Sequence, residues 1–244
     1  MTMKRIAVTS LLLAGMGWAA DTQVFDLSTS VEDPASAYRY DASTGAFTDN
    51  EAIDGTVLNE TNGANQIQTN ISFVLNLTEA MKVSSTTTLL LMDMNGGDVG
   101  LCLTTTGVAS TWNGATSGSR KSVSYATLLQ DTSVFTDADG NQCITLTMAQ
   151  TYGSGVQLYS NNAQLFSDTG LKATGNTTLS SVTLGTDYVD AVQFSPGWLS
   201  SQDAWLEKNQ AFDTAARAVL MPEPTTATLS LLALVGLAAR RRRA

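Results

Sequence analysis

Asn70-Ile71-Ser72-Phe73-Val74-Leu75-Asn76-Leu77 is the stretch of this chain that predicts its fold most clearly. Ile71, Phe73 and Leu75 alternate with Ser72, Val74 and Asn76. Successive side chains of an extended strand point to opposite faces, so this alternation gives the strand one apolar face. The stretch therefore predicts a β-strand with one buried side.

Further strand-like segments follow this one, separated by turn-forming residues at intervals of about eight to twelve residues. They are residues 87–92, 99–103, 123–129, 143–148, 156–159, 179–184 and 188–194. We predict a loop over the Gly/Ser/Thr-rich residues 110–119, and a short helix after the last strand, because Ser200 and Asp203 have the spacing of a helix cap. No long helical stripe interrupts the series, and the pattern indicates an all-β sandwich.

The first 20 residues have the composition of a secretory signal peptide. Lys4 and Arg5 form a basic start, residues 6–15 an apolar segment, and residues 17–20 a region of mainly small residues where cleavage is expected. The segment is too short and has the wrong flanks for a core helix. We therefore expect an exported protein whose mature body begins near residue 21.

The predicted body, residues 21–220, is long enough for one domain with a sizeable core. It carries seven basic and 21 acidic residues, a net charge of −14. Such a surface repels nucleic acid, and we expect no nucleic-acid partner. The chain has no histidine, which excludes a Ser-His-Asp triad and a histidine-based zinc site.

The chain has two cysteines, Cys102 and Cys143. Each sits in a strand-like segment, on the side opposite the alternating apolar residues. An exported protein meets an oxidising compartment, so these two residues are a candidate disulfide on one outer face of a sheet. Two unpaired thiols on separate strands are the alternative, because spacing alone does not fix the distance between them.

The chain ends in three distinct parts, residues 221–244. Pro222-Glu223-Pro224 comes first, an apolar run extends to Ala239, and four arginines, residues 240–243, follow. As a helix, residues 225–239 would reach about 22 Å, less than the roughly 30 Å hydrocarbon core of a membrane. The arginines are expected to stay cytoplasmic and to leave the body on the other side.

This ending resembles the PEP-CTERM sorting signal of Gram-negative bacteria. The resemblance implies that Pro222, Glu223 and Pro224 are the motif recognised by an exosortase, a membrane protease-transpeptidase that processes the tail. It also implies an inner-membrane intermediate and a final place on the cell surface or in an extracellular matrix, often with extracellular polysaccharide as a partner. A fortuitous membrane anchor with a rigid proline hinge is the alternative.

Residues 66–212 resemble a laminin-G-like, concanavalin A-like jelly roll, and the motifs match the back half of such a domain. The segments that carry the resemblance are residues 143–148, 154–162, 179–185, 190–194 and 198–203. Tyr159 matches a tyrosine that such domains place before an Asp-Gly turn, and Asn161-Asn162 replaces that turn here. The resemblance implies a concanavalin A-like β-sandwich over residues 21–220.

Two acidic loops have oxygen ligands of the kind that calcium prefers. Asp93, Asn95 and Asp98 surround a Gly-Gly turn and form the candidate calcium site, as in some loops of laminin-G-like domains. The other loop, residues 137–141, lacks the distal glutamate of an EF-hand and fits a simple Asp-Gly hairpin turn. Apart from calcium, we expect no cofactor.

Trp112 is the best candidate for sugar binding, because it stands among polar residues with Asn113 next to it. Sugar sites combine an exposed aromatic face with hydrogen-bonding groups. The alternative is a tryptophan that folds back over the core as a lid. Trp198 and Trp205 are expected to pack between the helix and the sheet.

Three functions are compatible with this sequence. We expect an exported surface or matrix protein that binds glycan through Trp112 and Asn113. A purely structural matrix or adhesion protein fits the acidic body as well. A polysaccharide hydrolase would need two acidic residues held about 5–10 Å apart, and the strand-like segments carry no such pair. We therefore predict no catalytic residues.

Overall fold

A computed structural model describes residues 38–221 of the 244-residue chain, with gaps at 45, 50–67, 95–96, 114–115, 117–119, 152–154, 162, 172–178 and 197–201. The predicted signal peptide and the predicted sorting motif, Pro222-Glu223-Pro224, lie outside this range. None of the helices in the described part is both long and apolar enough to span a membrane.

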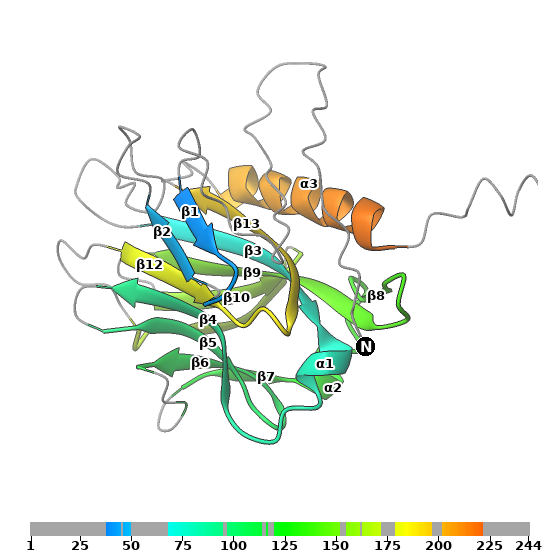
Figure 1. The fold of residues 1–244 in the computed structure, drawn as a ribbon, viewed down its shortest axis with the longest axis horizontal. Coiled ribbons are helices and arrows are strands. Elements are labelled where there is room, and N and C mark those ends of the chain that lie inside the picture. The colour runs from blue at the N-terminus through cyan, green and yellow to red at the C-terminus, as the bar shows by residue number, and fades with distance from the viewer. Residues whose placement is uncertain are drawn as a thin grey trace, which may run out of the picture.

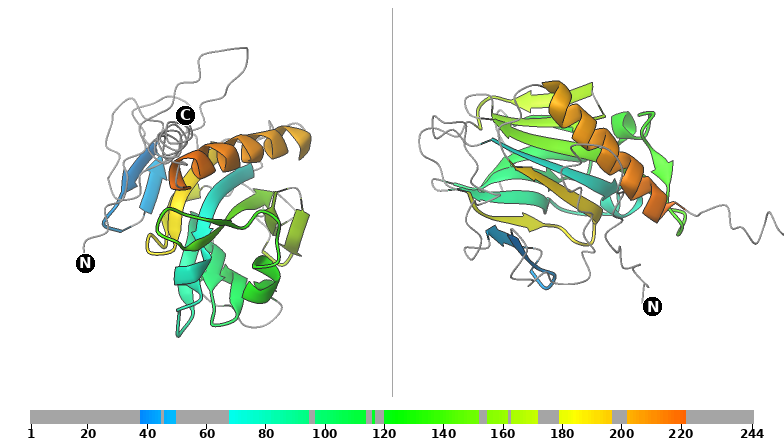
Figure 2. Two further views of the ribbon diagram at one scale, coloured as in Figure 1. Left: turned by 90° about the vertical axis from the view of Figure 1, so that its right-hand side faces the viewer. Right: turned by 90° about the horizontal axis from the view of Figure 1, so that it is seen from above.

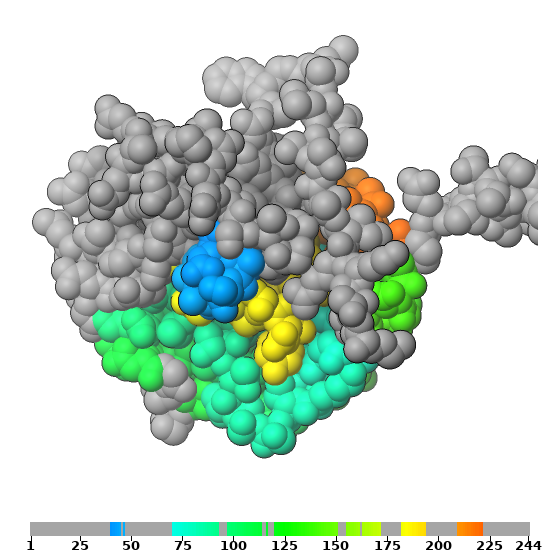
Figure 3. Space-filling view, in the orientation of Figure 1, coloured from blue at the N-terminus to red at the C-terminus, as the bar shows by residue number. Residues whose placement is uncertain are grey.

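Seven strands form the first sheet, in the spatial order β1-β2-β12-β4-β5-β6-β7. Their bounds are Tyr38–Asp41 (β1), Ala46–Asp49 (β2), Leu179–Leu184 (β12), Thr87–Met94 (β4), Val99–Leu103 (β5), Gly107–Trp112 (β6) and Ser122–Ser124 (β7). Every pair of neighbours is antiparallel. β12 comes late in the chain but lies between β2 and β4, and Figure 3 shows the blue atoms of the β1–β2 segment beside yellow atoms of the β12–β13 segment.

Six strands form the second sheet, in the order β11-β10-β9-β3-β13, with β8 paired to β9. Their bounds are Ala163–Asp168 (β11), Gly155–Ser160 (β10), Gln142–Thr151 (β9), Gln68–Asn76 (β3), Val189–Pro196 (β13) and Phe135–Thr136 (β8). All of these pairs are also antiparallel. The predicted all-β body of antiparallel sheets is confirmed (Figure 1).

The main core lies between the two sheets, which face each other (Figures 1 and 2). Ile71, Phe73 and Leu75 of β3 are fully buried there, as the alternation of the opening stretch predicts. The first sheet contributes Leu101 and Leu103 of β5 to the same cluster. Burying a side chain of this size stabilises the fold by about 1.5–3 kcal/mol.

Two one-turn helices directly follow strands β3 and β7. Asn76 ends β3 and caps helix α1 (Leu77–Ala80), because its side-chain oxygen accepts the Glu79 amide. Ser124 ends β7 and caps helix α2 (Tyr125–Leu128) in the same way, through the Thr127 amide. The predicted strand over residues 123–129 is therefore wrong after Ser124, since the cap turns the chain into a helix.

Helix α3 (Gln202–Leu220) crosses the outer face of the second sheet (Figure 2). The predicted helix exists and is longer than expected. Phe212 and Ala216 of α3 are buried against Val74 of β3, Ala191 of β13 and neighbouring residues, in a second, smaller apolar cluster. α3 thus covers the side of this sheet that faces away from the main core.

The remaining strands test the sequence pattern. The predicted bounds 99–103 and 179–184 agree with β5 and β12. The predicted loop 110–119 is wrong at its start, because β6 continues to Trp112 and pairs with β5 throughout. β11 was not predicted at all, and its first two residues are exposed polar or small side chains without an apolar alternation.

The predicted disulfide is wrong, because Cys102 and Cys143 are both free and both buried. Cys102 belongs to β5 of the first sheet, and Cys143 belongs to β9 of the second. Each cysteine points away from the main core, so the two lie on opposite outer faces of the sandwich with the core between them. Packed sheets lie about 10 Å apart, whereas a disulfide needs Cα atoms within about 7 Å.

A buried ion pair joins the two sheets at their open edge. Asp168 ends β11 of the second sheet, is 2% exposed, and lies 3.4 Å from the Arg120 Nε beside the first sheet. The Ser110 hydroxyl of β6 donates to the same carboxylate at 2.6 Å. A buried carboxylate is tolerated only when it is paired in this way. The contact therefore closes the side of the sandwich where β7 and β11 lie.

Candidate functional site

Trp112 is the last residue of β6 and one of the few large apolar side chains exposed in the described part of the chain, at 39%. It pairs in register with Val99, which is buried at the start of β5. Paired residues of neighbouring strands point to the same face, so the indole continues the core face to its outer end. The ring therefore covers the end of the core on one side and is open to solvent on the other. This arrangement combines the two interpretations of the sequence, a lid over the core and an exposed aromatic face.

Gly97 lies beneath the indole ring. A Cβ atom at this position would come within 2.5 Å of the Trp112 Cζ2 atom, so only glycine lets the ring lie this close. The Gly97 φ is +141°, a backbone conformation that other residues rarely adopt. The turn between β4 and β5 thus forms the seat of the tryptophan.

Asn113, the residue after Trp112, is hydrogen-bonded to the same turn. Its φ is +48°, in the left-handed region that asparagine tolerates better than most residues. Its amide donates to the Asp98 carbonyl at 2.8 Å, and its Oδ1 accepts the Asp98 amide at 2.7 Å. These two bonds hold the ends of β6 and of the β4–β5 turn together.

We call Gly97, Asp98, Trp112 and Asn113 the Trp112 site. No described residue bonds to the Asp98 carboxylate or to the Asn113 Nδ2, so an acceptor and a donor are available next to an open aromatic face. A sugar ring offers apolar C–H groups on one side and hydroxyls at its rim, and these groups match such a combination. The sequence predicted Trp112 and Asn113, and the structure adds Gly97 as the seat and Asp98 as the partner.

The calcium prediction falls mostly outside the described part of the structure. Asn95 and the side chain of Asp93 are not described, and Asp98 is engaged with Asn113 through its backbone. The calcium site at Asp93, Asn95 and Asp98 therefore stays a prediction.

The loop 137–141 forms the hairpin turn that the sequence favours. The Asp137 Oδ1 accepts the amides of Asp139 at 3.0 Å and Asn141 at 2.7 Å, and its Oδ2 accepts the Asn141 Nδ2 at 3.0 Å. Gly140 has a φ of +86°, as tight Asp-Gly turns require. The Asp137 carboxylate thus stabilises its own turn.

A second polar cluster lies between this turn and the second sheet. The side-chain ligand atoms of Asp137, Cys143 and Asp190 lie within 4.8 Å of one another. The Cys143 Sγ is 3.5 Å from the Asp190 Oδ2 and 4.0 Å from the Asp137 Oδ2. Asp190 is the extra residue of a β-bulge between Val189 and Ala191, a displacement that sequence periodicity does not indicate.

Thiolate and carboxylate groups can bind a metal, but the local bonds of this cluster favour a protonated thiol. Burial, followed by the charges of Asp190 and Asp137, raises the pKa of Cys143 far above its ordinary value. The thiol therefore keeps its proton, and its S–H donates a hydrogen bond to the Asp190 carboxylate, the nearer of the two. Burial likewise raises the pKa of Cys102. Neither sulfur has the lowered pKa of a reactive cysteine.

Tyr159, which carries the jelly-roll resemblance, is nearly buried near the end of β10. Its hydroxyl donates to the Gln157 Oε1 at 2.9 Å and accepts from the Gln164 Nε2 at 3.0 Å. Asn161 follows with a φ of +48° and turns the chain into β11, so it preserves the turn expected from the sequence. Asn162 lies outside the described residues.

No protein-family model matches this chain, and no curated protein matches it. Among solved structures, the botulinum neurotoxin serotype D binding domain is similar to 68% of this chain and 39% of that chain, at 12% identity and a TM-score of 0.42. The ligand binding domain of the same serotype in complex with N-acetylneuraminic acid is similar to 78% of this chain and 46% of that chain, at 11% identity and a TM-score of 0.36. A Trypanosoma rangeli sialidase is similar over 62% of this chain and 23% of that chain, at 11% identity and a TM-score of 0.39.

This chain spans less than half the length of each of these three structures. The sequence identities and TM-scores are low.

Proposed function

We propose that this protein is an exported cell-surface or matrix protein that binds glycan at the Trp112 site. The observation that carries the proposal is the geometry of that site: an indole ring 39% exposed, seated on Gly97 and flanked by Asp98 and Asn113. Sugar sites combine an exposed aromatic face with hydrogen-bonding groups next to it. An uncommitted donor and acceptor beside it favour binding.

The fold proposed for this site is a concanavalin A-like jelly roll, the finer form of the sandwich described above. Strand order supports it, because β12 lies between β2 and β4 while β13 lies beside β3, so that segments distant in sequence are neighbours in each sheet. The Trp112 site lies where β6 and the β4–β5 turn end, and loops at the ends of a rigid sandwich are common binding positions.

Export and sorting complete the proposal. The signal peptide over residues 1–20 would direct the chain across the inner membrane, and an exosortase would recognise Pro222, Glu223 and Pro224. The chain would pass through an inner-membrane intermediate before it reaches the cell surface or the matrix. Its partners would be the sorting protease and an extracellular polysaccharide, and its role would be binding rather than catalysis.

Affinity at a single site of this kind should be low. One stacked sugar ring with a few exposed hydrogen bonds corresponds to a Kd in the millimolar range, or about −4 kcal/mol. Many copies on one surface would raise the apparent affinity for a repeating polysaccharide, because linked sites bind together. A matrix protein present at high density would therefore not need a deep pocket.

The test is a glycan array followed by a titration of each bound glycan, on the protein from residue 21 to residue 221. Trp112→Ala should abolish binding, and Trp112→Phe should keep part of it because a smaller aromatic face remains. Met81→Ala is the matched control, since Met81 is 40% exposed and lies in the loop that follows α1, away from the Trp112 site.

Three results would overturn this proposal. Binding that persists in Trp112→Ala would move the site elsewhere, and the absence of binding to any glycan would leave a purely structural matrix or adhesion role. Release of sugars from a polysaccharide by the purified protein would favour the hydrolase alternative instead. Adding calcium in parallel titrations tests whether Asp93, Asn95 and Asp98 take part.

A further inference from the structure

Among the side chains that the structure describes, none from helix α3 belongs to the main core of the protein. The main cluster of buried apolar residues between the two sheets includes no residue of α3 within the described part of the chain. Phe212 and Ala216 instead join the separate, smaller cluster on the outer face of the second sheet. The sandwich therefore does not depend on α3 for its principal apolar contacts.

On the same outer face, the part of the second sheet that lies beside the smaller apolar cluster is polar. Asn70 and Ser72 of β3 alternate with the core residues Ile71 and Phe73, so they face the helix side of the sheet. Ser72 pairs in register with Gln193 of β13. Its hydroxyl donates to the Asn209 Oδ1 of α3 at 2.6 Å. These four residues, Asn70, Ser72, Gln193 and Asn209, form what we call the polar floor.

Several amide groups of the polar floor are buried without hydrogen bonds. Asn70 is 1% exposed, and neither its Oδ1 nor its Nδ2 has a partner. The Gln193 Oε1 and the Asn209 Nδ2 also have none. Rotating the Asn70 amide by 180° would not help, since both of its atoms are unpaired. Buried polar groups are nearly always bonded, so several orphans at one interface oppose the docking of α3.

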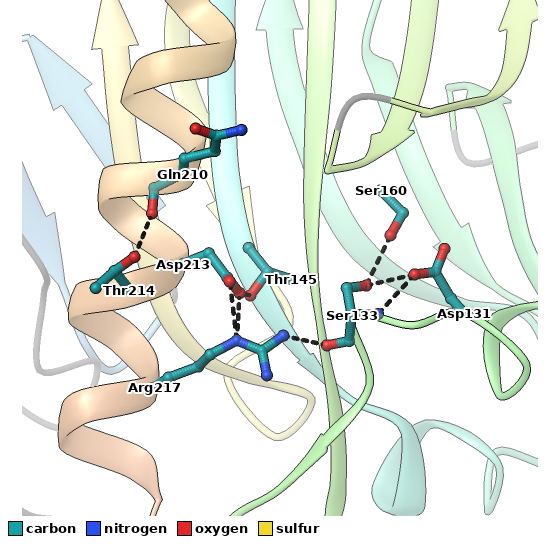
Figure 4. Close-up of polar contacts among 8 residues, drawn as sticks. All are labelled: Asp131, Ser133, Thr145, Ser160, Gln210, Asp213, Thr214 and Arg217. Atoms are coloured by element: carbon teal, nitrogen blue, oxygen red, sulfur yellow. Dashed lines mark hydrogen bonds and ion pairs between the residues drawn. The ribbon is translucent and has the colours of Figure 1, made fainter.

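A separate set of bonds holds the other end of α3 in place (Figure 4). Asp213 accepts from the Thr145 hydroxyl of β9 and from the Arg217 Nε, the latter at 2.8 Å. Arg217 also donates to the Ser133 carbonyl and lies 4.5 Å above the Phe135 ring. We call Thr145, Asp213, Arg217, Ser133 and Phe135 the latch.

We propose that α3 is a strap that detaches from the second sheet as a unit while the sandwich stays folded. Detachment lets water reach the orphan amides of the polar floor, which offsets the loss of the small apolar cluster. The latch opposes detachment through the three contacts that join α3 to the body, at Thr145, Ser133 and Phe135. Cooperative units that open below the free energy of global unfolding are common in proteins, and α3 has the contacts of such a unit.

Opening of the strap would change the surface that the protein presents. Asn70, Ser72 and Gln193 would become an uncharged, hydrogen-bonding strip on the outer face of the second sheet. With the strap closed, this strip is hidden. The strap therefore controls access to the part of the outer face that β3 and β13 form, and the Trp112 site at the end of the first sheet would be unaffected.

Native-state hydrogen exchange with mass spectrometry on the full chain tests the proposal. Amides of α3 should exchange at least tenfold faster than those of β5 in the main core. Asn70→Leu removes two orphan atoms at nearly constant side-chain size, and it should slow exchange in α3 by roughly tenfold. Arg217→Met should speed it, because the latch loses its charge and keeps most of its stem.

Asn76→Leu is the matched control. Asn76 lies on the same strand and the same side of the sheet, but its Oδ1 accepts the Glu79 amide, so this change removes a bond that is made. It should not slow exchange in α3. Equal exchange free energies for α3 and β5 in the wild-type chain would overturn the proposal even if a variant failed to fold. So would an Asn70→Leu protein whose α3 exchanges at the wild-type rate or faster.

Discussion

Replacing Gly97 by alanine tests the seat of the indole ring directly. The added Cβ would lie 2.5 Å from the Trp112 Cζ2 and 3.0 Å from two other ring atoms. Carbon atoms in contact normally keep about 3.5–4.0 Å, so the ring must move by about 1 Å or more. Because Trp112 is partly exposed, the ring can swing outward. The left-handed backbone at Gly97 adds a cost of about 1–3 kcal/mol.

Gly140→Ala separates these two effects. Gly140 also has a positive φ, +86°, but an added Cβ there would have no atom within 4 Å. Both variants should therefore lose about 1–3 kcal/mol of unfolding free energy in urea. Only Gly97→Ala should expose the indole, which acrylamide quenching of fluorescence measures, with Trp112→Phe used to subtract the other tryptophans. If quenching in Gly97→Ala matched that in the wild type and in Gly140→Ala, the ring would not rest on Gly97 and the described site would be wrong.

Three further changes test other parts of the structure. Burial raises the pKa of Tyr125 to about 12, against an ordinary value of 10. The stability that the protonated hydroxyl contributes should therefore be complete below pH 10 and disappear between pH 10 and 12. Thermal melts should show this loss, and Tyr125→Phe should remove it. Cys102 and Cys143 should react with a thiol reagent only after denaturation, and a mass consistent with a disulfide would contradict the two-sheet assignment. Asp168→Ala should lower the unfolding free energy by about 3–5 kcal/mol, because it leaves Arg120 without its carboxylate, and a loss below about 1 kcal/mol would show that the edge of the sandwich does not need this ion pair.

Strands with one apolar face could be predicted from the sequence, because their signal is local. Ile71, Phe73 and Leu75 alternate along β3, and Leu101 with its neighbours does so along β5, and all of these residues are in the main core. The failures also have local causes. Ser124 caps a helix in the middle of an apolar run, and the Gly/Ser/Thr-rich residues of β6 hide a strand that is buried nearly to its end.

Contacts between distant segments could not be predicted in this way. The alternation correctly placed Cys102 and Cys143 on outer faces, but nothing local to either strand says which sheet it joins. For the candidate site, the isolated position of Trp112 indicated its exposure. The role of Gly97 depends on a register between β5 and β6 that only the folded chain shows.

The position of β3 has a consequence for the time at which this protein can fold. Both strands that flank it, β9 and β13, come much later in the chain. Synthesis starts at the N-terminus, so the consecutive strands β4, β5, β6 and β7 can pair early. At that time the strands that flank β3 have not yet been made, and its apolar face is uncovered. Pairings between distant segments form slowly and leave apolar strands open to aggregation meanwhile. The apolar face of β3 is therefore expected to stay uncovered until residue 196 is available, and the chain is most open to aggregation during that interval.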